Sequence, residues 1–238
     1  MNNEMAYMKQ NVEEIREKMA LAAQAAGRRP EEVLLLAACK TRTVEEVRKS
    51  AELPIDIFGE NHVQELVEKS DAGAYLGKPA HLIGHLQTNK IKYVLGRAAL
   101  IHSVDSERLL LALESAAMKR NMVQDILIEV NIGAEATKTG LAADQLWKLL
   151  DLAAAQEHIS VKGLMSMPPA DTTDEENRHY FAKTRHLFEK ASELHYNNVS
   201  MEILSMGMSQ DYENAILEGS TLIRVGSSIY GARDYGVK

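Results

Sequence analysis

Short apolar runs alternate with charged, helix-like segments along most of the chain, and this alternation is the main signal of the fold. The eight runs cover residues 34–38, 55–59, 82–84, 99–104, 126–131, 161–167, 203–206 and 222–225. Continuous apolar runs are typical of parallel strands that are covered on both faces. Strands that alternate with helices form right-handed βαβ units. The pattern therefore predicts an α/β protein with a parallel sheet.

Several helix starts can be read from the segments between these runs. Thr43 and Glu46 have the spacing of a capping box, and Asp105 or Ser106 can cap the segment that follows the fourth run. Residues 142–155 and 174–194 predict later, longer helices. The first residues carry an apolar stripe with steps of three and four, which predicts an additional amphipathic helix that lies across the core.

Eight strand–helix units favour a closed barrel over an open, doubly wound sheet, which would show the same alternation. A chain of 238 residues with 45% hydrophobic content is long enough to bury one sizeable core. We therefore expect one domain over residues 1–238, a (β/α)8 TIM barrel with an extra N-terminal helix.

Composition narrows the classes of function. The net charge is −7, and Lys and Arg are not clustered, so we expect no nucleic-acid binding by a basic face. The single cysteine, Cys39, has no partner for a disulfide or a zinc cluster. No run of about 18 apolar residues and no signal-peptide pattern is present. We expect a cytoplasmic protein with no metal site and no membrane contact.

Lys40 ends the first apolar run, LLLAACK, and is therefore expected at the C-terminal mouth of the barrel, where barrel enzymes place their reacting groups. A lysine held against apolar walls loses its charge more easily, and the neutral amine attacks an aldehyde to give an imine. The alternative is an ordinary strand-end lysine whose amine reaches solvent.

Two small-residue turns follow the seventh and eighth runs, the positions at which barrels often bind phosphate. Backbone N–H groups and hydroxyls in such turns can converge on an anion. The candidates are Ser205, Met206 and Gly207 in one turn and Gly226, Ser227 and Ser228 in the other. The alternative is that glycine and serine simply make tight turns there.

Other polar residues are expected near the same mouth. Arg224 lies inside the eighth apolar run, where it either binds a ligand atom or pairs with Glu129 of the fifth run. His85 can stack on a planar ligand, transfer a proton or simply hydrogen-bond to neighbouring loops. Lys138 is a second lysine at the mouth, where a solvated loop position is the alternative.

The chain resembles the pyridoxal phosphate homeostasis protein family, which is related in fold to the N-terminal barrel of alanine racemase. The resemblance runs from about Val33 to Tyr235. It rests on the motifs ACKTRT around Lys40, FGENHVQE, HLIGHLQTNK, VNIGAEATKTG, KGLMSMPP, SMGMSQDYENAI and RVGSSIYGARDY.

The resemblance implies a site for pyridoxal 5′-phosphate (PLP). Lys40 is then the Schiff-base lysine, Arg224 faces the pyridine nitrogen and Asn61 lies near the ring. The implied phosphate residues are Ser205, with its neighbour Met206, and Gly226 and Ser227. Two departures from the family pattern are Cys39, where serine is common, and Gln210, where an acidic residue is frequent. Cys39 leaves open what polar group supports Lys40.

These features predict a PLP carrier or buffer that supports vitamin B6 and amino- and keto-acid homeostasis without strong catalysis. Apo-PLP enzymes are the expected recipients, and we expect a monomer. Only a short tail follows Tyr230, so we expect no second domain with an opposing catalytic tyrosine. The alternative is a weak PLP-dependent amino-acid racemase that uses Lys40 and a tyrosine or His85 as its two bases. A third hypothesis is a barrel that binds another phosphorylated metabolite.

Overall fold

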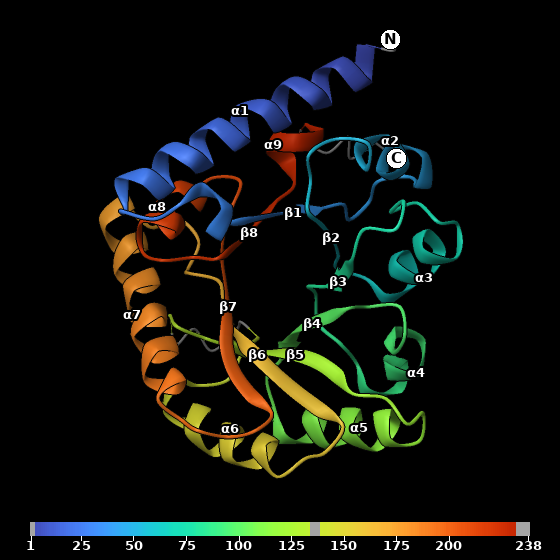
Figure 1. Cartoon of the computed structure of the whole chain (residues 1–238), viewed down its shortest axis with the longest axis vertical. Helices are drawn as coiled ribbons and strands as arrows, with labels where there is room; N and C mark the ends of the chain where they lie inside the picture. Colours follow the sequence, from blue (N-terminus) through green and yellow to red (C-terminus); the bar gives the residue numbers. More distant parts are fainter. Residues whose placement is uncertain (1–2, 134–138, 232–238) are drawn as a thin grey trace.

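A computed structural model describes residues 3–133 and 139–231 of the chain. Within them, eight parallel strands pair in sequence order, and β1 pairs with β8 to close the barrel (Figure 1). The strands are β1 (Leu34–Ala38), β2 (Ile57–Glu60), β3 (Ala80–Leu82), β4 (Leu100–Val104), β5 (Gln124–Val130), β6 (Ile159–Ser166), β7 (Val199–Met208) and β8 (Leu222–Val225). The predicted (β/α)8 fold is confirmed.

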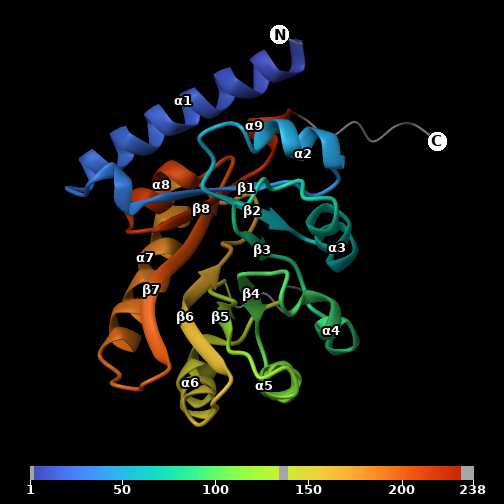
Figure 2. The ribbon, with the colours of Figure 1, turned by 45° about the vertical axis from the view of Figure 1, so that its right-hand side comes forward.

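Helices surround the barrel and alternate with its strands (Figure 1). They are α1 (Asn3–Ala25), α2 (Val44–Ser50), α3 (Val63–Asp71), α4 (Ile91–Val94), α5 (Glu107–Met118), α6 (Leu146–Ala154), α7 (Asp174–Ser192), α8 (Tyr212–Leu217) and α9 (Ser227–Tyr230). The predicted N-terminal helix is α1, which lies outside the ring beside α8 and α9 (Figure 2). The Asn11 amide fastens it there by donating to the carbonyl of Ile229 at 2.9 Å.

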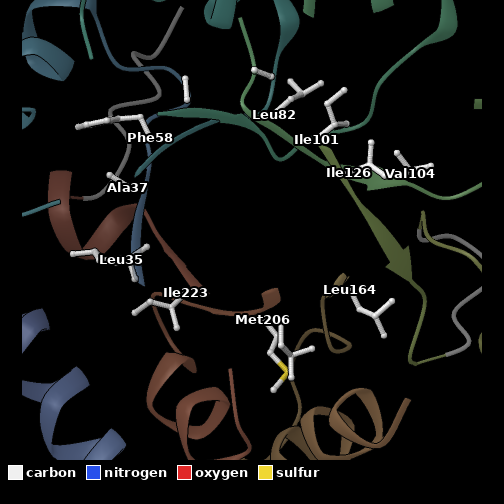
Figure 3. Close-up of a cluster of buried hydrophobic side chains, with 14 of the residues drawn as sticks. Leu35, Ala37, Phe58, Leu82, Ile101, Val104, Ile126, Leu164, Met206 and Ile223 are labelled. Carbon is white, nitrogen blue, oxygen red and sulfur yellow. The ribbon is translucent and has the colours of Figure 1, made fainter. Parts of the chain in front are cut away.

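The main core lies between the strands and the helices. Alternate strand residues such as Leu35, Phe58 and Ile101 point out of the barrel into this layer and are fully buried (Figure 3). The helices bury the outer face of the sheet, while side chains from the other alternate positions fill the inside. Both faces of each strand are therefore covered, which explains the continuous apolar runs of the sequence.

The barrel interior combines apolar packing with a chain of buried polar groups. Leu36, Ile57 and Leu222 form one apolar cluster inside the barrel. Next to it, His81 Nδ1 lies 2.9 Å from His102 Nε2, and His102 Nδ1 lies 3.1 Å from the hydroxyl oxygen of Ser205. Polar groups without access to water must find partners in this way.

Most predicted boundaries agree with the structure, and the largest difference is in β7. Thr43 and Glu46 form the predicted capping box, and Ser106, not Asp105, caps α5. The strand β7 extends to Met208, so Ser205–Gly207, which were expected in a turn, belong to the strand. That prediction was wrong because Gly207, with a φ of 94°, forms a bulge within the strand instead of a turn, and the pairing with β8 shifts register between Ser205 and Met208. No helix of the described residues is long and apolar enough to cross a membrane.

The two interior histidines predict a loss of stability in mild acid. Burial lowers the pKa of His81 to about 3 and that of His102 well below its usual value, so both rings stay neutral in the folded protein. In the unfolded chain they take up protons below about pH 6.5. Their contribution to stability is thus complete above that pH and is lost as the pH falls toward 3. Each histidine is expected to lower the free energy of unfolding by about 2 kcal/mol when the pH falls from 7 to 5.

Urea unfolding at pH 7 and pH 5 measures this loss, and His102→Gln should reduce it by about 2 kcal/mol because one titrating ring is gone. His179→Gln, which removes an exposed histidine of α7, is the matched control and should behave like the wild-type protein. If His102→Gln and the wild-type protein show the same pH dependence, the loss of stability in acid does not come from the buried His102.

Candidate functional site

The loops that follow β1, β7 and β8 enclose a cavity of about 250 Å³ at the C-terminal end of the barrel. Barrel closure places these loops together, since β8 lies next to both β1 and β7. Four predicted site residues line the cavity, namely Lys40, Arg224, Gly226 and Ser227. The volume is close to the lower end of the range for small-molecule pockets.

Lys40 is half-buried and lies in a turn immediately after β1. The turn is closed by the N–H of Arg42, which donates to the carbonyl of Cys39 at 3.1 Å. Cys39 is fully buried, and its thiol donates to Glu60 Oε1 at 2.9 Å. The polar support behind Lys40 that the sequence left open is therefore an acidic side chain at the end of β2.

Arg224 projects into the barrel and is only 5% exposed. It donates to the hydroxyl oxygen of Ser205 at 2.6 Å and to the carbonyl of Ser166 at 3.1 Å. Burial lowers the pKa of the guanidinium to about 10, which leaves it cationic at neutral pH. Glu129, the alternative partner that the sequence offered for Arg224, accepts from the hydroxyl of Thr139 at 2.7 Å. Arg224 thus brings a fixed positive charge to the cavity.

Ser205 lies beneath the cavity and contacts it through Arg224. Its side chain is fully buried and its oxygen accepts from the guanidinium. Because the Ser205 oxygen accepts from Arg224, its own hydroxyl proton is available for His102 Nδ1. A neutral His102 then carries its proton on Nε2, which faces His81 Nδ1. One hydrogen-bond chain therefore runs from Arg224 across the barrel interior, and both imidazoles take part in it without a charge.

The loops after β7 and β8 are joined by Ser209. Its hydroxyl oxygen accepts from the backbone N–H of Gly226 at 3.2 Å and from that of Ser228 at 3.4 Å. Gly226 favours this close approach, because a Cβ atom there would lie 3.0 Å from the carbonyl oxygen of Ala38 and would crowd it. Two N–H groups thus converge on one oxygen at the edge of the cavity, which is the arrangement that suits an anion.

Met206 is fully buried and points away from the barrel interior, into the layer of helices (Figure 3). Its side chain is therefore separated from the cavity by the strand. Ser209 lies in the same motif, SMGMSQD, two residues beyond Gly207, and was not among the residues predicted for the site.

A second hollow of about 450 Å³ adjoins the other side of Lys40 and is lined by Asn61, His85 and Lys90, among others. Within the described part of the chain, Asn61 Oδ1 is buried without a hydrogen-bond partner. Gly84 packs directly on the backbone of Asn61, where a side chain would collide. His85 is exposed at the rim. Lys138, the predicted second lysine, lies outside the described residues.

Sequence reasoning missed the two buried histidines and the carbonyl of Ser166 as partners behind Arg224. His81 and His102 each interrupt an apolar segment, AHLIG and AALIHSV, and that interruption is the signal that could have identified them.

A wider depression of about 780 Å³ lies at the opposite end of the barrel, beside the starts of β3 to β5. That end of the fold generally serves stability.

The family model for the N-terminal domain of alanine racemase matches residues 6–234. The pyridoxal phosphate homeostasis protein of Aquifex aeolicus is 41% identical over 219 residues, which are 92% of this chain and 95% of that protein. An unknown protein from Bifidobacterium adolescentis has a similar crystal structure, with a TM-score of 0.89, 30% identity and 96% of each chain covered.

PipY of Synechococcus elongatus, solved with PLP bound, has a TM-score of 0.78 and 29% identity over 90% of this chain and 100% of that chain. The domain match covers all the elements that build the cavity, and the alignment to the Aquifex protein spans nearly the whole of both chains. The chain therefore belongs to the pyridoxal phosphate homeostasis protein family, within the group that shares the alanine racemase N-terminal domain.

Proposed function

We propose that this protein binds PLP as a Schiff base on Lys40 and carries or buffers it, in support of vitamin B6 and amino- and keto-acid homeostasis. The observation that carries the proposal is the single cavity that Lys40, Arg224 and the loop of Gly226 and Ser227 share. An amine, a cation and a group of N–H donors are the three features that an aldehyde, a pyridine nitrogen and a phosphate require. The relatives named for PLP homeostasis support it.

The phosphate is assigned to the loops after β7 and β8. Gly226 and Ser227 line the cavity, and the N–H groups that now meet Ser209 Oγ are oriented for an anionic oxygen. Ser205, the other predicted phosphate residue, acts in this proposal through Arg224, which it holds by a 2.6 Å hydrogen bond. Met206 contributes its backbone and the packing behind the strand. Asn61 remains assigned near the ring, on the opposite side of Lys40.

Arg224 limits the chemistry of the proposed site. PLP supplies an electron sink when its pyridine nitrogen is protonated. A guanidinium held beside that nitrogen disfavours protonation. Burial leaves Arg224 charged at neutral pH, and Ser205 and Ser166 fix its position. The arrangement favours storage of the aldehyde over strong carbanion chemistry.

Tyr230 lies at the cavity but is poorly suited to donate or accept a proton there. Its hydroxyl is 2.9 Å from the hydroxyl of Ser50, and burial raises its pKa well above the usual value. Arg42 covers the ring, with its guanidinium carbon 5.3 Å from the ring centre. The neutral phenol is thereby occupied in packing α9 against α2. This observation favours a carrier over an enzyme with two opposed bases.

The first test is the visible spectrum of the purified protein with added PLP, followed by borohydride reduction and peptide mapping. We expect a yellow protein with a pyridoxyl group on Lys40. Lys40→Ala should lose both signals because no other amine shares the cavity with Arg224 in the described part of the chain. Lys90→Ala, a change in the adjoining hollow, is the matched control and should keep both. A colourless wild-type protein without adduct would overturn the proposal in favour of a different phosphorylated ligand.

A weak amino-acid racemase is the second candidate, and the alanine racemase domain match favours it. In that case Lys40 and His85, which is exposed at the rim, would remove and return the α-proton. Mass spectrometry in deuterated water tests this with L-alanine and the PLP-loaded protein. The carrier hypothesis predicts no α-deuteration beyond that given by free PLP. Rapid α-deuteration that disappears in Lys40→Ala would establish the enzyme instead.

The wider role in the proposal is transfer of PLP to apo-PLP enzymes by a monomeric, cytoplasmic protein. The buried free thiol of Cys39 is consistent with a reducing compartment.

A further inference from the structure

We infer that Glu65 and Lys69 of α3 are positioning residues for Lys40, a pair that we call the α3 clamp. The inference rests on the proposed function of Lys40 as the Schiff-base lysine. The two clamp residues are four positions apart and so lie on one face of the helix. Each binds one of the two peptide groups that flank Lys40.

Lys69 holds the residue before Lys40. Its ammonium group is buried, 1% exposed, and donates to the carbonyl oxygen of Cys39 at 2.8 Å. The same nitrogen lies 2.7 Å from Glu60 Oε1, which also receives the Cys39 thiol at 2.9 Å. Cys39 is therefore held at its carbonyl by Lys69 and at its side chain by Glu60, two polar side chains that are buried.

Glu65 holds the residue after Lys40. Its Oε2 accepts from the backbone N–H of Thr41 at 3.0 Å and lies 3.6 Å from Lys69 Nζ. Thr41 has a φ of 66° in a turn position that usually takes glycine or asparagine. A β-branched residue with this backbone conformation is strained, so the turn persists only where its surroundings impose it. The carboxylate of Glu65 is such a constraint.

Stability alone does not account for this arrangement. A buried ion pair such as Lys69–Glu60 gives little net stabilisation, because the cost of removing both charges from water offsets their attraction. Apolar side chains of similar volume would serve the core equally well. The contacts of the clamp end instead on the backbone of Cys39 and Thr41, so their specific effect is to fix where Lys40 leaves the strand. A reacting amine needs that precision toward a bound aldehyde.

The test compares PLP with pyridoxine 5′-phosphate, which has an alcohol in place of the aldehyde and binds without reacting with the lysine. Glu65→Ala should weaken PLP binding roughly tenfold, the factor expected for the loss of a charged hydrogen bond. Its affinity for pyridoxine 5′-phosphate should change less than twofold because the phosphate and ring contacts remain. Glu65→Gln keeps an acceptor for the Thr41 N–H and should recover part of the loss. Glu68→Ala, on the exposed face of α3, is the control and should leave both affinities unchanged.

Lys69→Met is the stronger variant, but it leaves Glu60 buried without its cation and can prevent folding, so Glu65→Ala decides the question. Equal losses for both ligands in Glu65→Ala would assign the pair a general structural role and overturn the inference. Unchanged PLP affinity would overturn it as well, while the wild-type adduct on Lys40 leaves the proposed function intact. Absence of that adduct in the wild-type protein would overturn both together.

Discussion

Closure of the barrel between β1 and β8 is the constraint on which the rest of the structure depends. The pairing places Leu36 opposite Arg224 and Ala37 opposite Val225, so the two strands end side by side. Lys40 follows the first strand and Gly226 follows the last, although more than 180 residues separate them in the sequence. Gly226 allows the approach, since it packs on the carbonyl of Ala38. An amine and a set of N–H donors thereby meet without any local sequence relation.

The charged groups beneath this mouth are held by two separate networks. Inside the barrel, Arg224 binds Ser205, and the hydrogen bonds continue to His102 and His81. Outside the strands, Lys69 joins Glu60 to the carbonyl of Cys39. One network fixes a cation and the other fixes the turn that bears the lysine. Loss of any one partner from either network destabilises the fold, because a buried polar group without a partner loses its hydration without compensation.

The sequence predicted the fold more fully than the site. Continuous apolar runs identify strands that are covered on both faces, and capping residues such as Thr43 and Ser106 give the helix starts. Lys40, Arg224 and Gly226 could be expected at one mouth because each lies at or near the end of a run. The β7 boundary could not be predicted, since Gly207 resembles a turn residue although it lies in the strand with a φ of 94°. Pairing across the barrel, as between His102 and Ser205, depends on register and stagger, which no local pattern contains.

The division between the two networks bears on how a carrier differs from an enzyme of the same fold. A catalytic site needs groups whose protons move, whereas several polar groups at and beneath this cavity have fixed partners. The Tyr230 hydroxyl meets Ser50, the interior histidines meet each other, and Arg224 keeps its proton at neutral pH. Lys40 is the one cavity group for which the proposal requires a reaction, and that reaction is reversible imine formation. Under the proposed function, such a site holds an aldehyde and returns it unchanged, which is the property that buffering demands.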